Sequence, residues 1–199
     1  MRAKAAISGL LGLLVAASGG PAEAGRIVDY PTDYPSGEIL ISQSAKRLYL
    51  ILDGRTAIAY PVAVAKHGKE WNGPARVAGK FVEPAWSPPD SVKRDHPELP
   101  EVIPGGSPSN PMGARAITLD RDKIAIHGTT RAMRASIGTA ASYGCIRMLN
   151  EDVIDLYQRA HVGTKVIVLP MSHLEAANGN RPLDLTASHA MTIGHSVVR

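Results

Sequence analysis

The fold is decided by residues 38–66, which read EILISQSAKRLYLILDGRTAIAYPVAVAK. This stretch contains three apolar runs, at residues 39–41, 48–52 and 58–65. The pair Asp53-Gly54 between the second and third runs is a strong signal for a tight hairpin turn. The pattern predicts consecutive β-strands joined by short connections.

Further strands are expected later in the chain. The short apolar runs 116–119 and 124–126 are joined by a polar turn, and the second run would deliver His127 at its end. A β-branched run at 165–169 predicts a last strand.

One clear helix is expected between these strands. Asn150 is a typical N-cap residue, and Gly163 is a typical stop. The acidic pair Glu151 and Asp152 suits the first turn. The expected buried side consists of Val153, Ile154, Leu156, Tyr157 and Ala160. Together these features predict a mainly β (α+β) fold: a single domain built as a mixed β-sandwich with one or two short helices.

A long loop rich in Pro and Gly interrupts the strand pattern. Residues 84–113 hold eight of the fifteen prolines and show no hydrophobic period. Loops of this length inside a domain are usually functional, so we interpret the segment as a lid; the alternative is a proline-stiffened excursion.

The first 24 residues have the organisation of a secretory signal peptide. Residues 1–4 carry two basic side chains, residues 5–17 are apolar or small, and Ala22-Glu23-Ala24 has the small-x-small pattern of a cleavage site. We expect cleavage after Ala24 and an exported, periplasmic location. The apolar stretch is shorter than the roughly 20 residues that span a bilayer, so no stable membrane span is expected.

The charge of the chain is a weak guide to its partners. The formal net charge is +4, and the basic residues are scattered without a run, so nucleic-acid binding is not expected. His67, His96 and His161 are isolated from partners at zinc-ligand spacing, so no metal is expected.

Cys145 is the only cysteine of the chain and cannot form an internal disulfide. Keeping an unpaired thiol outside the cytoplasm suggests a chemical role. His127, eighteen residues earlier, could act as its base, and Gly144 would let backbone amides approach a reacting carbonyl. These residues fit acyl transfer through a thioester, although a lone cysteine is more often a small buried apolar residue.

Several ordered motifs narrow this interpretation. The chain reads Ile126-His-Gly-Thr129, then Ser136-Ile-Gly138, then Ser142-Tyr-Gly-Cys-Ile-Arg-Met148, with Asn110-Pro-Met-Gly-Ala-Arg-Ala116 upstream and Gly163-Thr-Lys-Val166 downstream. From about Glu38 to Pro170 the chain resembles the L,D-transpeptidases, the YkuD-domain family of bacterial envelope enzymes.

The resemblance implies roles for individual residues. Cys145 would be the nucleophile and His127 its base, and the carbonyl of Gly128 would orient the imidazole. Amide hydrogens near Gly144 and Cys145, together with Tyr143, would stabilise the oxyanion.

The resemblance also suggests residues that meet the substrate. Arg147 would meet a stem-peptide carboxylate, the alternative being a structural hydrogen bond to the turn. Ser142 is a further candidate. Trp86 could stack on sugar rings, although a tryptophan in such a loop more often anchors it to the core.

Two positions depart from the family. Many members have histidine where this chain has Tyr143, and a phenol is not a base near neutral pH. Asn72-Gly-Pro-Ala75 also stands where many members have a Thr-Pro-x-Gly segment.

The sequence thus predicts an exported L,D-transpeptidase that acts on peptidoglycan stem peptides without a cofactor. Its parts would be a signal peptide (1–24), a linker (25–37), the catalytic domain (38–170) and a disordered tail (171–199). The same thioester could instead pass to water, as in an L,D-carboxypeptidase, or to a lysine of an envelope lipoprotein. An inactive peptidoglycan-binding protein is the rival from another class. The family resemblance also implies a covalent adduct with carbapenem-type β-lactams.

Overall fold

The computed structural model describes residues 25–170. The expected signal peptide and the expected tail therefore lie outside the described residues. The strands are β1 (Arg26–Asp29), β2 (Ile39–Ser42), β3 (Arg47–Ile51), β4 (Thr56–Ala65), β5 (Gly73–Val82), β6 (Arg115–Leu119), β7 (Ala125–His127), β8 (Ala140–Ser142), β9 (Ile146–Met148) and β10 (Lys165–Leu169). The helices are α1 (Asp90–Asp95), the short 3-10 helix η1 (Arg134–Ser136) and α2 (Asn150–Arg159).

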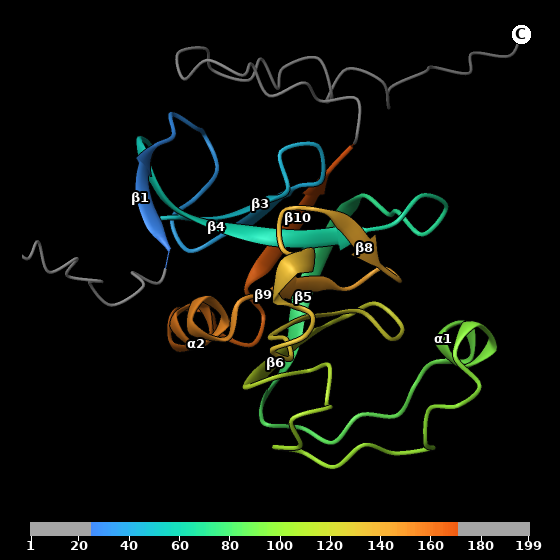
Figure 1. Ribbon diagram of the computed structural model, residues 1–199. Helices are drawn as coiled ribbons and strands as arrows, with labels where there is room; N and C mark the ends of the chain where they lie inside the picture. Colours follow the sequence, from blue (N-terminus) through green and yellow to red (C-terminus); the bar gives the residue numbers. More distant parts are fainter. Residues whose placement is uncertain (1–24, 171–199) are drawn as a thin grey trace, which may run out of the picture.

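The strands form one mixed hydrogen-bonded network in the order β1-β4-β3-β2-β10-β5-β6-β7-β9 (Figure 1). The long strand β4 pairs with β3 along its first half and with β9 near its end, so the network closes on itself. The predicted mainly β fold is confirmed. The closed arrangement is broadly consistent with the predicted mixed β-sandwich, and its long strand β4 pairs with β1, β3, β8 and β9.

The predicted strands at 39–41, 48–52, 58–65, 116–119, 124–126 and 165–169 all form, with shifts of one or two residues at their ends. Their apolar side chains fill the main core, in which Tyr60, Ile117, Ile126 and Leu156 are fully buried. This core lies behind β7 and β9 and fixes their positions relative to each other.

The segment at 25–37, predicted as a linker, contains strand β1. This strand pairs antiparallel with β4, with Arg26 opposite Ala59 and Asp29 opposite Thr56. Tyr30 and Tyr34 pack against a small second cluster built around buried Leu40 and Ile51. The segment therefore belongs to the sheet, because its tyrosines cover apolar surface that β2 and β3 leave exposed.

Helix α2 begins one residue earlier than predicted, because Asn150 is its first residue and not its N-cap. Leu149 occupies the N-cap position and makes no side-chain cap hydrogen bond, whereas Asn150 is the first helical residue. Its side chain is turned toward two loops. Val153, Leu156 and Ala160 are buried as expected, and Ile154 and Tyr157 are only partly covered.

The Pro-rich segment at 84–113 extends from the side of the sheet away from α2 and carries α1 (Figure 1). Its base is closed by Asn110, whose buried amide donates to the carbonyls of Pro84, Ile103 and Pro104. A backbone pairing between Trp86 and Ile103 holds the two arms together. The loop is thus an ordered structure with a defined base. None of the helices between residues 25 and 170 is long and apolar enough to span a bilayer.

Candidate active site

The pairing of two short strands brings the candidate residues together. Strands β7 and β9 run parallel, with His127 directly opposite Arg147. Cys145 comes immediately before β9, two residues from Arg147, and alternate residues of a strand share one face. The structure therefore places the thiol, the imidazole and the guanidinium on the same side of this strand pair.

His127 is held in one tautomer. Its Nδ1 lies 2.8 Å from the carbonyl oxygen of Gly128. Since a carbonyl oxygen can only accept a hydrogen bond, Nδ1 carries the hydrogen, and Nε2 keeps its lone pair. This is the form of imidazole that can take a proton.

The imidazole is also neutral at physiological pH. His127 is only 2% exposed, and burial lowers its pKa to about 4. The positive charge of Arg147 acts in the same direction, whereas the carbonyls of Gly128 and Pro111 oppose it. A base of this kind stays unprotonated well below neutral pH.

The thiol is likewise neutral in the resting site. Burial raises the pKa of Cys145, and the Ala125 amide and the charge of Arg147 only partly offset this. Its Sγ lies 3.5 Å from the carbonyl oxygen of Lys123. Burial thus favours the uncharged form of both the thiol and the imidazole.

The turn that presents the thiol is built by its own side chains. The hydroxyl of Ser142 donates to the carbonyl of Cys145 at 2.5 Å and accepts from the amide of Gly144 at 3.2 Å. Ser142 is buried, so its hydrogen bonds serve the turn and not a substrate. Gly144 has φ +124, and a Cβ there would come within 2.8 Å of Ile124, which explains the glycine.

Trp71 supports the same turn, a role that sequence reasoning did not find. Its indole Nε1 donates to the carbonyl of Gly144 at 2.9 Å, and its own carbonyl accepts from Gln43. Arg121 lies 4.4 Å over its ring. Its only signal in the sequence is a tryptophan beside a turn, which does not reveal a partner seventy residues away.

Tyr143 is engaged by two charged side chains. Its hydroxyl donates to Asp95 of α1 at 2.5 Å, and Lys66 lies 3.6 Å over its ring. Lys66 also pairs with Asp95 at 3.3 Å. The departure from the family histidine therefore ties the loop that carries α1 to the turn that carries Cys145.

Arg147 is buried, and only some of its hydrogen-bond donors have a partner among the described residues. Its Nη1 donates to the hydroxyl of Ser136 at 2.7 Å, and that hydroxyl donates in turn to the carbonyl of Met133. Its Nε is buried without a hydrogen-bond partner among the described residues. Ser136 of the Ser136-Ile-Gly motif thus orients a guanidinium whose Nε is left without a hydrogen-bond partner among the described residues.

Asn150 joins two of the sequence motifs. Its Oδ1 accepts from the amides of Ala114 and Thr129, and its Nδ2 donates to the carbonyl of Thr129. A Cβ on Gly113 or Gly128 would come within 2.3 or 2.2 Å of this Oδ1. The two glycines are therefore required by the close approach of Asn150, which holds the backbone that follows His127.

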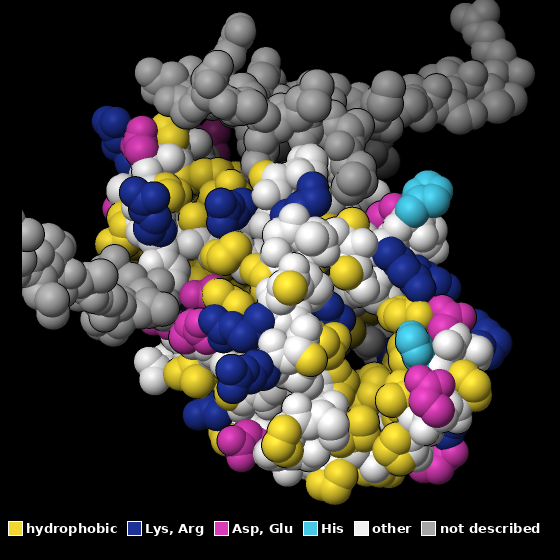
Figure 2. All heavy atoms as spheres, viewed as in Figure 1, with side chains coloured by type: hydrophobic (Ala, Val, Ile, Leu, Met, Phe, Trp, Pro, Cys, Tyr) yellow, Lys and Arg dark blue, Asp and Glu magenta, His cyan; other side chains and the backbone are white. Residues whose placement is uncertain are grey.

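Trp86, the other predicted substrate residue, is half-buried in the Pro-rich loop and pairs through its backbone with Ile103. The structure gives it no hydrogen bond to the residues around Cys145. The space-filling view shows a hollow between the body of the domain and the loop, with hydrophobic side chains around it (Figure 2). Within residues 25–170, no cluster of three His, Cys, Asp or Glu side chains could hold a metal ion.

The sequence matches a known protein family and several of its members. Residues 36–168 match the profile of the YkuD family, the L,D-transpeptidase catalytic domain. The probable L,D-transpeptidase YbiS of Escherichia coli (strain K12) is 32% identical over 173 residues, covering 80% of this chain and 55% of that protein. The putative L,D-transpeptidase YqjB of Bacillus subtilis (strain 168) is 34% identical over 136 residues, covering 65% of this chain and 69% of that protein.

Solved structures share the fold. The crystal structure of L,D-transpeptidase 3 from Mycobacterium tuberculosis superposes with a TM-score of 0.53 at 16% identity, covering 68% of this chain and 62% of that one. An L,D-transpeptidase from Mycobacterium smegmatis gives the same TM-score over 77% of this chain and 81% of its own. The chain spans about half the length of the E. coli relatives that it matches. By its profile and its relatives, the chain belongs to the YkuD family of L,D-transpeptidases.

Proposed function

We propose that this protein is a peptidoglycan L,D-transpeptidase that forms a thioester on Cys145. The observation that carries the proposal is the neutral, buried His127, whose Nδ1 hydrogen is committed to Gly128 and which lies on a strand beside the strand that follows Cys145. The family supports the substrate class, a stem tetrapeptide of the cell wall.

The first half-reaction transfers the donor acyl group to sulfur. Nε2 of His127 takes the proton of the thiol as Sγ attacks the carbonyl carbon of the L,D peptide bond. The carbonyl oxygen gains negative charge, and the amide of Cys145 is the donor we assign to it, since the Gly144 amide is engaged by Ser142. The C–N bond then breaks, and the leaving D-alanine takes the proton from His127.

The second half-reaction reverses these proton movements. An acceptor amine attacks the thioester, His127 removes a proton from the attacking nitrogen, and the C–S bond breaks. His127 then returns a proton to the sulfur. Because the imidazole has a low pKa, its protonated form is a strong acid that readily gives up the proton at each step.

Arg147 is the residue we assign to substrate anchoring. Its free Nε and its position opposite His127 suit a carboxylate or carbonyl of the stem peptide near the thiol. Its Nη1 donates to Ser136 of η1, so the side chain also has a structural hydrogen bond, and the two contacts would use different nitrogens.

The proposal is tested by product analysis. Purified protein would be incubated with a disaccharide tetrapeptide, alone and with a stem-peptide acceptor, and the products separated by chromatography with mass detection. Cross-linked dimer is the expected product. Tripeptide without dimer would instead favour the L,D-carboxypeptidase or a protein lysine as acceptor. Turnover that persists in Cys145→Ser, a variant that keeps the size of the side chain, would contradict the thioester.

A further inference from the structure

Asp152 is a buried carboxylate with an incomplete set of partners. It lies in the first turn of α2 and is 3% exposed. Its Oδ1 accepts one hydrogen bond, from the backbone nitrogen of Gly25 at 3.1 Å. Its Oδ2 is buried with no hydrogen-bond partner among the described residues. A buried carboxylate normally has a cation or several donors around it.

The surrounding charges do not supply what is missing. Burial is the main cause that raises the pKa of Asp152, to about 6, and the nearby carboxylates of Glu151 and Asp155 add to the rise. The Gly25 amide and the more distant Arg134 act in the opposite direction. Arg134 is itself paired with Glu151 at 2.6 Å, and Asp155 with Arg159 at 2.9 Å. Within residues 25–170, the hydrogen-bond donor that the structure gives the Asp152 carboxylate is therefore the backbone nitrogen of Gly25.

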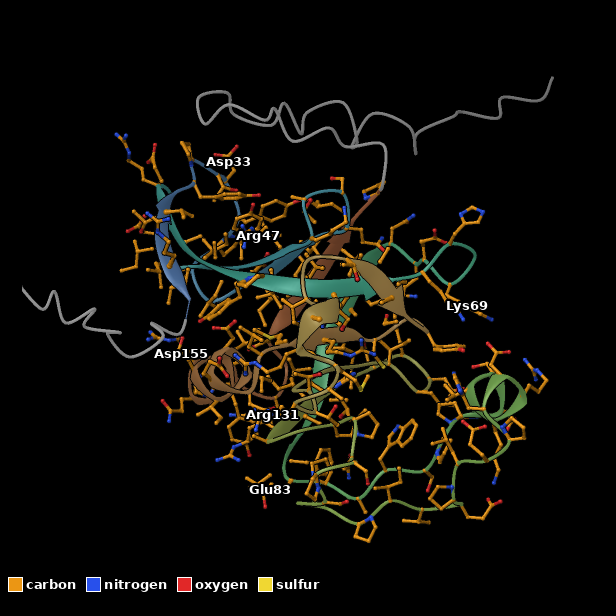
Figure 3. The ribbon with its side chains drawn as sticks, in the orientation of Figure 1. Asp33, Arg47, Lys69, Glu83, Arg131 and Asp155 are labelled. Carbon is orange, nitrogen blue, oxygen red and sulfur yellow. The ribbon has the colours of Figure 1, made fainter. Side chains whose placement is uncertain are left out.

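Gly25 fits a pocket that excludes any side chain. A Cβ on this residue would come within 2.5 Å of both Ile58 and Tyr60. Its φ of +69 also favours glycine. The pairing of β1 with β4 holds the residue there, since Arg26 lies opposite Ala59. In Figure 3, Asp155 marks the part of α2 that lies close to the start of the described chain.

Gly25 is also the residue that follows the expected cleavage site, Ala22-Glu23-Ala24. Cleavage of the Ala24–Gly25 peptide bond by water converts this amide nitrogen into an α-ammonium group with three donors. We propose that the ammonium group of Gly25, formed when the leader is removed, pairs with the buried carboxylate of Asp152 and completes the fold. The neutral amide of the precursor donates one hydrogen bond, to Oδ1 of Asp152. The ammonium group would offer further donors and a positive charge to Oδ2.

The pair would link processing to the catalytic framework. Asp152 lies two residues after Asn150, whose side chain fixes the backbone that follows His127. An ion pair in the first turn of α2 would therefore stabilise the position of Asn150, which binds the backbone after Gly113 and Gly128. The inference rests on export and cleavage after Ala24, not on transpeptidation, and its readouts are stability and ionisation, so it can fail independently of the proposed activity.

The test compares three forms of the mature chain. One begins with a free Gly25, one carries an acetyl group on Gly25, and one begins with Ala24. Acetylation keeps an amide at the same position and removes the charge; the extra alanine keeps the charge and displaces it. In urea at pH 7, the free-Gly25 form is expected to have a folding equilibrium constant at least about tenfold larger than either other form, or a Tm about 3–6 °C higher. Equal midpoints for the three forms would overturn the proposal.

Asp152→Asn removes the negative charge but keeps an acceptor oxygen, so it should erase the advantage that the charged amine gives the free-Gly25 form over the acetylated form. Glu151→Gln is the matched control, because Glu151 is the adjacent acid and pairs with Arg134. In this control the difference should persist. If Asp152→Asn does not fold, the comparison of the free and acetylated forms still decides the question.

Ionisation gives an independent readout. The pKa of the Gly25 amine, followed by NMR, should rise above the ordinary 7.7–8.0 of an α-amino group. An amine whose pKa is higher in the folded than in the unfolded state stabilises the protein when it is protonated. The stability advantage of the free-Gly25 form should therefore be full below about pH 7.7, the pKa of the amine in the unfolded chain, and should be lost as the pH rises through its pKa in the folded chain. In the acetylated form, the raised pKa of Asp152 predicts instead that stability falls as the pH rises from about 4 to about 6. An ordinary amine pKa, or an exported protein whose first residue by N-terminal sequencing is not Gly25, would also overturn the proposal.

Discussion

At the scale of single residues, burial sets the chemistry of the site. It lowers the pKa of His127 and raises that of Cys145, so both effects favour the uncharged pair. This differs from a cysteine site that rests as a thiolate and an imidazolium. The proton would move only when the substrate carbonyl is in place.

The pKa of His127 predicts the acid limb of the reaction. The base must be unprotonated, so the rate of acylation should fall as the pH drops through about 4 and not through 6.5. Single-turnover acylation by the tetrapeptide from pH 3.5 to 8 measures this limb, with circular dichroism at each pH to exclude unfolding. A limb centred near 6.5 would contradict a buried neutral base.

The pKa of Cys145 makes a separate prediction. Because the chain has one cysteine, alkylation by iodoacetamide reports on that thiol alone. The midpoint of the rate against pH should lie above the ordinary value of about 8.5. His127→Ala should leave the midpoint high. A midpoint below 7 that depends on His127 would show an ion pair in place of two neutral groups.

At the scale of elements, the site is held by contacts between segments that are distant in sequence. Asn150 at the start of α2 fixes the loops after Gly113 and Gly128, and Trp71 before β5 fixes the turn at Gly144. None of these pairings follows a local pattern. They depend on how the closed sheet brings the segments together.

Removal of the Asn150 side chain should weaken this framework. Asn150→Ala deletes three hydrogen bonds and leaves the amides of Ala114 and Thr129 without their partner. Each such bond contributes about 1 kcal/mol, so the free energy of unfolding should fall by ~2–3 kcal/mol in urea denaturation. Gly128→Ala should destabilise the wild-type protein more than the Asn150→Ala variant, because its Cβ clashes with Asn150. Equal costs in both backgrounds would contradict this packing.

Tyr143 predicts a link between α1 and the catalytic turn. Tyr143→Phe and Asp95→Ala each remove the hydrogen bond that joins them, and should raise KM about two- to fivefold while leaving acylation by bound substrate nearly unchanged. The double variant should be no worse than either single variant. Glu98→Gln, on the same loop and paired with His96, is the control. Additive effects of the two substitutions would show that they do not act through one contact.

At the scale of the whole molecule, much of the fold followed from local pattern, but its closure did not. Strand β5 was missed because Ala75, Val77 and Gly79 alternate with charged or small residues and carry little apolar signal. Strands β8 and β9 have three residues each, too few for a period to be read. The pairing of β4 with β9 shows that the sheet closes, and the pairing of β7 with β9 places these two strands side by side.

The candidate site could also be predicted only in part. His127, Gly128 and Cys145 each lie in a short sequence motif, so they could be named as candidates from the sequence. The directions of Ser142 and Tyr143 could not be read from the sequence, because each depends on a hydrogen bond to a group that only the folded chain places there. The burial of Asp152 was missed for the same reason, since an acidic residue in a first helical turn is ordinarily exposed.

The most direct test of the proposed mechanism is the intact mass of the protein during turnover. The chain that begins at Gly25 would be quenched in acid within seconds of mixing with disaccharide tetrapeptide and then weighed by mass spectrometry. The mechanism predicts a covalent adduct equal to the substrate without its terminal D-alanine, located on Cys145, absent from Cys145→Ser and much reduced in His127→Ala. Cross-linked product formed by a protein that never carries this adduct, or an adduct on any other residue, would contradict it.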